Sequence, residues 1–417
     1  MNISLNKVKI LFLLTIVAFM MPQYANGDEQ VVSISGKVKN KQNNKTLSNV
    51  SLSVPGTNIA TVTNADGFFI LKMPEKVFKN GIKAEHVGFK SSMMSGKELL
   101  SNRGDIVFYL EPTGKVLKEV VVYGGEPKKI VQEAIRKIPT NYSDIDNLFS
   151  GFYRETVRKG SRFISISEAI VDVLKKPYKN RNINGEKVRI HKGRKLLSQN
   201  PSDTLAVKLA GGPYMPIMLD IVKNGDQLFT SDEIDYFDFK KEEPVMIDDR
   251  MHFAISFKPN VKFSYPLNKG KLFIDGETLS ISRAEFELDM SDRNKVTRSI
   301  LQKKPSGLHF KPQEVSGVVT YKLVDGKSYL NYISSTIKFK CDWKKRLFSS
   351  GYTTHSEMVM VDRDDNPDRH LKFSDSFGKR NIFSDVVENY WEEDFWKDYN
   401  IIEPTESLEK AVGKLKK

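Results

Sequence analysis

The sequence is poor in the residues that build covalent or metal-linked sites. It contains one cysteine, Cys341, so a disulfide framework, a cysteine-rich zinc site and an iron–sulfur cluster are excluded within one chain. None of its six histidines is followed by glutamate three positions later, so the helical ligand pair of zinc peptidases is missing. No Gly-x-Ser-x-Gly elbow and no phosphate-binding Gly-x-x-x-x-Gly-Lys loop occurs. We therefore expect no cofactor and no metal.

Long hydrophobic runs are also missing after residue 27. No later segment extends even 12 residues without a charge, a proline or a glycine. A membrane-spanning helix needs about 20 predominantly apolar residues, so we predict no transmembrane segment in the mature chain.

The composition is that of a folded protein with a modest basic excess. Of the 417 residues, 39% are hydrophobic, which supplies enough apolar surface for two or three domains. Lys and Arg number 65 against 52 Asp and Glu, a formal net charge of +13. This excess permits contact with anionic surfaces but does not single out nucleic acid.

The first 27 residues have the order of a secretory signal peptide. Lys7 and Lys9 form a basic start, an apolar stretch extends from Ile10 to Met21, and Ala25-Asn26-Gly27 supplies small residues for cleavage. The alternative is an uncleaved anchor, although the apolar stretch is short for one. We predict an exported protein of the periplasm or outer membrane that begins near Asp28, which removes nucleic acid from the expected partners.

Residues 28–113 predict a small β-sandwich. Val31 to Val38 and Leu47 to Val54 alternate apolar and polar residues, as strands with one buried face do. Pro55-Gly56 and Asp66-Gly67 are turn dipeptides between such runs. About seven short strands fit this segment, which is typical of a sandwich.

This segment resembles a known domain family. Its residues read ISGKVKNKQNNKTLSNVSLSVPGTNIATVTNADGFFILKMP, followed by AEHVGFK and FYLEPTGKVLKEVVVYG. They are similar to the carboxypeptidase-regulatory-like, prealbumin-like (transthyretin-like) sandwich that precedes TonB-dependent outer-membrane receptors in Bacteroidetes. The plug and barrel of those receptors do not follow here. In the matching residues, Gly67 permits a tight turn and Asp66 can bond its own backbone.

Residues 114–126 predict a linker, and residues 127–417 predict a larger β-rich domain with a helix at each end. The first helix shows an apolar stripe before Pro139: Ile130, Val131, Ala134, Ile135 and Ile138. The last shows a second stripe near the C-terminus: Leu408, Ala411, Val412 and Leu415. Residues 196–250 are less regular and indicate an inserted helix and loops.

The middle of this domain predicts an antiparallel meander. Asp275-Gly276 and Asp325-Gly326 each separate two strand-like runs, a strong hairpin signal. The apolar pattern changes face near Arg283-Ala284, which indicates a bulge. We predict a mostly β protein in which a seven-stranded prealbumin-like sandwich precedes a large antiparallel sheet or half-barrel with flanking helices.

The larger domain also resembles known proteins. FYRET, GRK, GKLFIDGETLSISRAEFEL, YTTHSEMVMVD and DFWKDYNIIEPTESLEKAVGKLKK are similar to segments of Bacteroidetes envelope proteins that carry this sandwich. That resemblance implies architecture and location but no chemistry. The sheet segment is more faintly similar to lipoprotein-carrier half-barrels, in its strand–turn–strand pattern only.

Two short patterns partly resemble metal sites. His355 and Glu357 share one face of a predicted strand, but two ligands do not make a zinc site. DRDDNPD at 362–368 begins like a calcium loop, yet Pro367 and Phe373 stand where the loop requires Gly and Glu. Both favour an ordinary strand or a solvated loop.

Residues 175–195 concentrate positive charge, with nine basic residues against Glu186 alone. Such a segment favours an exposed loop or sheet edge, and alternatively a patch for lipid phosphates or an acidic glycan. The candidate contacts are Lys175, Lys176, Lys179, Arg181, Lys187, Arg189, Lys192, Arg194 and Lys195.

The sequence as a whole favours a non-enzymatic envelope protein that acts in binding or assembly, with an envelope protein or an anionic glycan or lipid as partner and with a TonB-dependent or secretion system as its setting. One alternative is a periplasmic carrier of lipid or lipoprotein that uses a concave sheet. Another is a hydrolase with a dispersed site. A deep apolar groove would favour the carrier, and a cleft that brings His, Asp and Ser together would favour the hydrolase.

Overall fold

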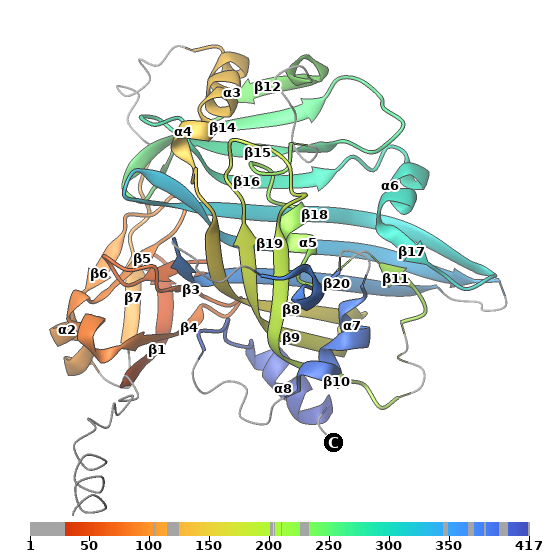
Figure 1. Cartoon of the computed structure of the whole chain (residues 1–417), viewed down its shortest axis with the longest axis horizontal. Helices are drawn as coiled ribbons and strands as arrows, with labels where there is room; N and C mark the ends of the chain where they lie inside the picture. The colour runs from red at the N-terminus through yellow and green to blue at the C-terminus, as the bar shows by residue number, and fades with distance from the viewer. Residues whose placement is uncertain are drawn as a thin grey trace, which may run out of the picture.

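The computed structural model of the chain is mostly β (Figure 1). The structure describes residues 30–102, 106–114, 125–200, 203, 205–209, 211–225, 233–344, 349–365, 371–378, 381–391 and 399–415. The predicted signal peptide, residues 1–27, and most of the predicted linker lie outside these ranges.

Seven strands form the N-terminal sandwich, as the sequence predicts. They are β1 (Val31–Asn40), β2 (Ser51–Ser53), β3 (Ala60–Val62), β4 (Phe68–Pro74), β5 (Ile82–Glu85), β6 (Ser92–Met94) and β7 (Ile106–Leu110). A three-stranded sheet, β4-β1-β7, accompanies a four-stranded sheet, β3-β2-β5-β6. Inward residues of both sheets, such as Val38, Leu52, Phe69 and Phe108, form one core. The helix α2 (Gly96–Ser101) begins at a capping box made by Ser95 and Glu98.

The turn at residues 64–68 confirms one part of the prediction and corrects another. Gly67 has a φ of +76°, and a Cβ there would lie 2.7 Å from the Cβ of Thr46, so the turn requires glycine. The side chain that fixes the turn is not Asp66 but Asn64, whose Oδ1 accepts from the backbone N–H of Asp66 at 2.9 Å and of Phe68 at 3.0 Å. The Asp66 carboxylate lies elsewhere and accepts from a distant backbone N–H in the C-terminal segment.

The second part of the chain is built on one eleven-stranded sheet with the order β10-β9-β8-β20-β19-β18-β16-β15-β14-β12, and β13 also pairs with β14. Its strands are β8 (Asn147–Lys159), β9 (Arg162–Lys175), β10 (Lys187–Leu197), β12 (Phe237–Lys241), β13 (Val245–Ile247), β14 (Arg250–Pro259), β15 (Asn268–Asp275), β16 (Ile281–Leu288), β18 (Leu308–Val324), β19 (Lys327–Trp343) and β20 (Ser350–Asp364). Every pairing is antiparallel, as a meander requires. A separate two-stranded sheet pairs β11 (Lys208–Leu209) with β17 (Leu301–Lys303).

Both predicted hairpins of this sheet are confirmed. Asp325 and Gly326, with φ of +49° and +79°, join β18 to β19 in a two-residue turn. Asp275-Gly276 begins the connection from β15 to β16, which is longer and includes Leu279 at a φ of +63°. The predicted bulge lies beside Arg283, where the β15–β16 register shifts.

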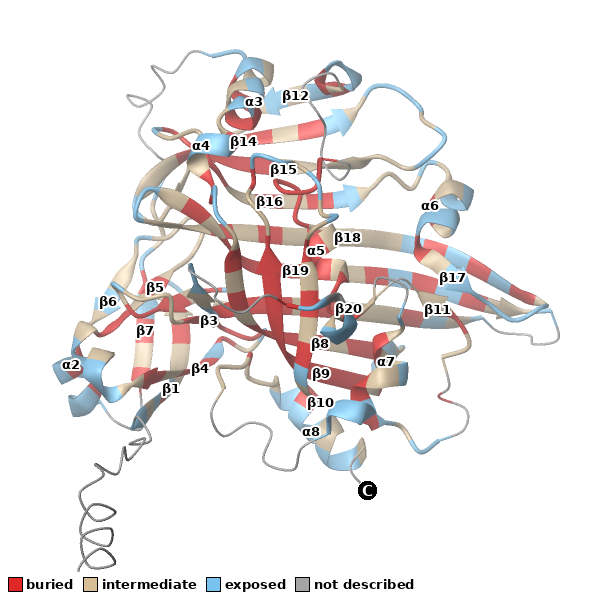
Figure 2. Ribbon diagram, in the orientation of Figure 1, coloured by how far each residue is buried: buried red, intermediate tan, exposed pale blue. Residues whose placement is uncertain are grey.

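The sheet curls around helix α5 (Met215–Met218), and we name its two faces accordingly (Figure 1). The inner face carries Phe149, Tyr153, Val319, Ile333 and Met358. The outer face carries Phe152, Ile170, Tyr332 and Val359, which pack against Val62 of the sandwich. Figure 2 shows the central strands banded with buried residues, as expected for a sheet covered on both faces.

Several short helices surround the sheet. They are α3 (Pro127–Arg136), α4 (Ile138–Asn141), α6 (Arg293–Ile300), α7 (Phe383–Val386) and α8 (Glu406–Leu415). The predicted stripe of α3 is buried, but the helix ends at Arg136 and Pro139 lies in the first turn of α4. In the part of the chain that the structure describes, no helix is both long and apolar enough to cross a bilayer.

A C-terminal strap, residues 399–406, fills the seam between the sandwich and the outer face. Asn400 exchanges two hydrogen bonds with the backbone of Lys72, at 2.6 and 2.9 Å. Ile402 is 1% exposed, and its carbonyl accepts from Arg154 of β8 at 2.8 Å. The strap therefore holds both parts of the molecule at once.

Candidate functional site

An apolar pocket lies on the inner face, between the sheet, α5 and α6. It encloses about 240 Å³. None of its lining residues is charged: they are Met215, Met218, Leu219, Tyr265, Pro266, Asn268, Phe286, Leu288, Ser299, Ile300, Val315, Ser316, Ser335 and Ile337. The pocket therefore offers hydrocarbon and a few neutral polar groups to a ligand.

Two glycines shape this pocket. A Cβ on Gly317 of β18 would lie 2.7 Å from the ring of Phe286, so only glycine lets that ring lie against the strand. Gly212, at a φ of +82°, precedes α5, and a Cβ there would lie 2.9 Å from the ring of Phe377. The first glycine sets one wall of the pocket, and the second allows the chain to approach the sheet before α5.

Serine hydroxyls that line the pocket already have hydrogen-bond partners within the fold. The Oγ atoms of Ser335 and Ser356 lie 2.8 Å apart, and the Oγ of Ser299 donates to the carbonyl of Val296 at 2.9 Å. A group that enters the pocket thus meets few unsatisfied hydrogen-bonding atoms, which favours hydrocarbon over a polar ligand.

A buried ion cluster lies directly after the residues of α5 that line the pocket. The Nζ of Lys175 lies 2.7 Å from Glu186 and 2.7 Å from Asp220, and all three side chains are 0% exposed. Tyr178 donates to Asp220 at 2.8 Å and Tyr321 donates to it at 2.5 Å. Because Asp220 directly follows Leu219, this cluster fixes the segment that covers the pocket.

The protonation states of the cluster follow from burial and pairing. Burial disfavours the Lys175 ammonium, but Asp220 and Glu186 more than offset this and raise its pKa. Burial also opposes the Asp220 carboxylate, yet Lys175 and the two tyrosine hydroxyls lower its pKa. Burial raises the pKa of Glu186 and raises that of Tyr178 well above its usual value. Pairing thus favours the charged forms of Lys175 and Asp220, whereas burial favours the neutral form of Glu186.

The structure does not gather the nine predicted basic residues on one exposed surface. Lys175 is fully buried in the ion cluster, whereas Lys179 is exposed. Arg181 donates to the carbonyls of Val222 and Ile221, at 3.2 and 3.4 Å. The predicted sheet edge is real, because residues 187–197 form the edge strand β10.

The other basic residues of this segment have partners within the fold. Lys176 pairs with Asp146, Lys187 donates to the carbonyl of Leu371, Arg189 pairs with Asp172, Lys192 lies 5.4 Å from the ring centroid of Tyr399, Arg194 pairs with Glu168, and Lys195 donates to the carbonyl of Ser384. Most of the local positive charge therefore serves internal contacts. An anionic-ligand patch stays a prediction that depends chiefly on Lys179.

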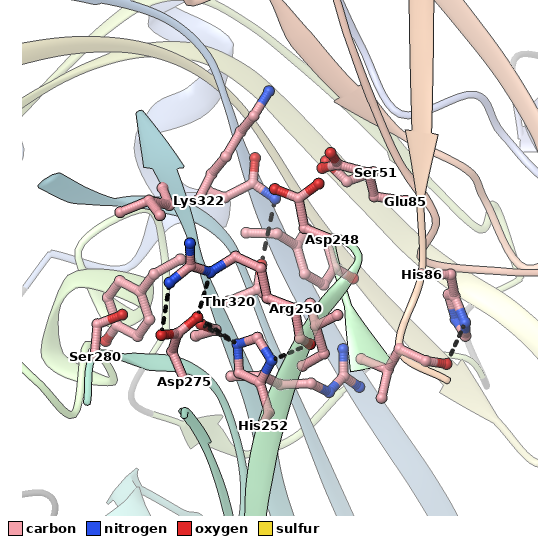
Figure 3. A pocket seen from close by; sticks show the side chains of 18 of the residues that line it. Ser51, Glu85, His86, Asp248, Arg250, His252, Asp275, Ser280, Thr320 and Lys322 are labelled. Atoms are coloured by element: carbon pink, nitrogen blue, oxygen red, sulfur yellow. Dashed lines mark hydrogen bonds and ion pairs between the residues drawn. The ribbon is translucent and has the colours of Figure 1, made fainter. Parts of the chain in front are cut away.

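A second cavity, of about 80 Å³, lies in the seam between the sandwich and the sheet (Figure 3). It brings His252, Asp275 and Ser282 together, the combination that would favour a hydrolase. In a catalytic triad the carboxylate contacts Nδ1 of histidine and the serine contacts Nε2. Here Nδ1 lies 2.9 Å from the carbonyl oxygen of Arg250, while Ser282 at 2.8 Å and Asp275 at 3.8 Å both face Nε2. The arrangement therefore departs from a triad.

Asp275 has a structural role in this cavity. Its carboxylate accepts from Nε of Arg250 at 2.6 Å and from a second guanidinium nitrogen at 2.8 Å. It also accepts from the backbone N–H of Glu277 at 2.9 Å and of Thr278 at 2.8 Å, which holds the hairpin turn. Although burial opposes its charge, these donors lower the pKa of Asp275.

The seam cavity also holds a pair of carboxylates from the two parts of the chain. Glu85 of the sandwich and Asp248 of the sheet domain are both paired with Lys83. Burial, followed by the neighbouring Asp248, raises the pKa of Glu85 to about 7. Burial lowers the pKa of Lys322, which faces the same pair. The charged residues of this cavity therefore link the sandwich to the sheet.

The two short patterns that partly resemble metal sites lie in β20 or begin there. His355 and Glu357 do share a face, at 3.9 Å, but Glu357 also pairs with Arg154. Within the described ranges, no group of three His, Cys, Asp or Glu side chains could hold a metal ion. Asp362 and Asp364 lie in β20, and the loop residues Asn366 and Pro367 lie outside the described ranges.

The sequence reasoning missed the residues of the apolar pocket. Two signals were present: the methionines of Met215-Pro-Ile-Met218, and a helix that begins after Asp292 and places Val296 and Ile300 four positions apart. Asp292 caps α6 by accepting from two backbone N–H groups, at 3.0 and 3.2 Å. Neither signal reveals that these segments meet the sheet at one place.

The comparisons with known proteins support the sandwich assignment. Residues 34–122 match a family model described as a CarboxypepD_reg-like domain. This match covers the N-terminal part of the chain and does not extend over the larger sheet. No curated protein matches the chain.

Three solved structures are similar to parts of the chain. A DUF1329 family protein from Desulfovibrio piger is 10% identical, with 60% of this chain and 99% of that chain covered and a TM-score of 0.26. A LolA superfamily protein from Nitrosomonas europaea is 12% identical, with 61% and 99% covered and a TM-score of 0.23. A protein from Bacteroides fragilis, described as putative membrane-associated, is 8% identical, with 79% and 97% covered and a TM-score of 0.14. Scores this low carry no argument.

Proposed function

We propose that this protein is a non-catalytic binding protein of the cell envelope that holds an acyl chain in the apolar pocket of its inner face. The observation that carries this proposal is the cavity of about 240 Å³ whose lining contains no charged residue. An apolar cavity of about 150 Å³ is enough to bind benzene, so this pocket has room for several methylene groups.

The chemistry of the lining fits a hydrocarbon chain. Each methylene that leaves water contributes about 0.8 kcal/mol to binding. Met215 and Met218 line one side, and methionine side chains adapt to ligands of irregular shape. A charged headgroup would find no counter-ion among the lining residues, so it would stay at the mouth of the pocket.

This proposal develops the carrier alternative of the sequence analysis. The envelope location is supported by residues 1–27, whose order is that of a secretory signal peptide. The non-catalytic role is supported by His252, whose Nε2 faces both Ser282 and Asp275 in the seam cavity. In its broader form, the proposal is that this protein binds or assembles beside another envelope protein.

The test is titration of the protein with a fluorescent acyl probe, cis-parinaric acid. We expect saturable binding that is displaced by palmitate. Leu288→Asp places a carboxylate in the pocket lining, and we expect it to weaken probe binding at least tenfold, because the charge must lose water when the chain enters.

The matched control is Leu100→Asp, which makes the same change at a side chain of the sandwich that is 47% exposed. We expect this variant to bind the probe as the unmodified protein does. Thermal unfolding of both variants checks that each is folded. Equal probe binding by a folded Leu288→Asp variant, or no saturable binding at all, would contradict the proposal.

A further inference from the structure

The mouth of the apolar pocket carries an exposed aromatic loop. Residues 260–267 connect β14 to β15, and Tyr265 and Pro266 of this loop line the pocket. The same loop lines a larger groove of about 680 Å³ that it shares with residues 289–295. The loop therefore stands between the inner pocket and the solvent.

Apolar side chains on and beside this loop face solvent. Tyr265 is 48% exposed, Val261 is 38% exposed and the neighbouring Tyr236 is 38% exposed. The rings form a row, with centroids 5.2 Å apart from Tyr236 to Phe263 and 5.4 Å apart from Phe263 to Tyr265. We call Tyr236, Val261, Phe263 and Tyr265 the loop patch.

The loop is held in place although its tip is exposed. The backbone N–H of Asn260 donates to the carbonyl of Tyr236 at 2.9 Å, and the backbone N–H of Asp289 donates to the carbonyl of Leu267 at 2.9 Å. The ammonium of Lys295, in α6, donates to the carbonyl of Phe263. Hydrogen bonds at both ends and in the middle fix the loop patch before any partner arrives, which lowers the entropic cost of binding.

We propose that the loop patch docks on the surface of a lipid bilayer, so that an acyl chain passes between the bilayer and the pocket beside Tyr265. This inference rests on the proposed function, because the patch matters as the mouth of an acyl-binding pocket. Tyr side chains bring an apolar ring and a polar end, which suits the boundary between headgroups and hydrocarbon.

The charges around the loop patch indicate that the apolar side chains dominate this contact. Lys262 lies on the loop, but Asp289 and Asp292 line the same groove, together with Arg293 and Lys295. With both signs present, attraction to anionic lipid is weak. Binding should therefore change little with salt, unlike binding through the basic segment at 175–195.

The experiment is co-sedimentation of the purified chain with vesicles of phosphatidylcholine and phosphatidylglycerol at a ratio of 3:1, in low and high salt. Tyr236→Ser with Val261→Ser removes two exposed apolar side chains that do not line the pocket. We expect vesicle partition to fall about tenfold or more, with binding of the acyl probe in solution unchanged.

The matched control is Tyr109→Ser with Val31→Ser, at sandwich positions that are 47% and 52% exposed. This variant should bind vesicles normally. Leu288→Asp should also bind vesicles but lose the acyl probe, so failure of the pocket and failure of the docking surface give different results. No vesicle binding, equal binding by the loop variant, or binding that high salt abolishes would overturn the inference.

Discussion

Two of the cavities among the described residues differ in the residues that line them. The pocket on the inner face has only uncharged lining residues, whereas the cavity in the seam is lined by Glu85, Asp248, Arg250 and Lys322 among others. The first lies between elements of one domain, and the second lies between the sandwich and the sheet. Uncharged lining residues lose little free energy when hydrocarbon replaces the water beside them. Charged lining residues lose much more unless counter-ions pair with them. The comparison indicates that the pocket on the inner face is the ligand site and that the seam cavity is the contact between the sandwich and the sheet.

The pocket nevertheless depends on charges that lie just outside it. Lys175, Glu186 and Asp220 are fully buried, and Asp220 directly follows the segment that covers the pocket. The seam depends on charge too, but there Glu85 and Asp248 are carboxylates whose main shared partner is Lys83. Pairing favours the charged forms of Lys175 and Asp220 in the first cluster, whereas Glu85 in the seam has a pKa of about 7.

The largest effect is expected from Lys175→Met. The substitution leaves Glu186 and Asp220 buried without their cation, so we expect the free energy of unfolding to fall by about 3–5 kcal/mol. Denaturant unfolding measures this loss. Lys179→Met, at an exposed position of the same basic segment, should change stability by less than about 0.5 kcal/mol. Equal stability of the two variants would show that the ion cluster does not stabilise the fold.

A smaller loss is expected from Arg154→Met in the seam. Arg154 pairs with Glu168 at 2.6 Å and donates to the carbonyl of Ile402 at 2.8 Å, but Glu168 keeps a second partner in Arg194. We therefore expect a loss of about 2–3 kcal/mol and faster proteolysis of the C-terminal strap. The control is Arg158→Met, an exposed position of the same strand. A strap that resists protease in Arg154→Met would show that charge does not hold the seam.

The smallest effect is expected from the titration of Glu85. Its folded-state pKa of about 7 exceeds the model-compound value of 4.5, so its contribution to stability is present below pH 4.5 and is lost as the pH rises through 7. We expect about 1 kcal/mol, because Lys83 and Asp248 share the titration. Glu85→Gln should flatten the stability profile between pH 5 and 8, whereas Glu75→Gln, at an exposed position, should not. Parallel profiles for Glu85→Gln and the unmodified protein would refute this reading of the seam.

Local signals predicted the strands and hairpins but not the cavities. The seven sandwich strands and the turns at Gly67 and Asp325-Gly326 follow from alternation and from residues that accept a positive φ. The role of Asn64 was missed because Asn and Asp both bond nearby backbone, and only the fold decides which one does. The sequence also cannot show that Lys175 meets Asp220, 45 positions away. A charged residue in a basic segment looks exposed until its partner is known.

The C-terminal strap has a consequence for the order in which the molecule assembles. Its contacts with the sandwich join residues 340 and 328 positions apart, as in the bonds from Asn64 to Pro404 and from Lys72 to Asn400. Loops of that length are slow to close, and residues 399–406 follow both folding units along the chain. The sandwich can therefore fold early. Phe152 and Ile170 on the outer face stay exposed to water until the strap docks. Until the strap docks, the folding chain presents an apolar surface to which other incompletely folded chains can adhere.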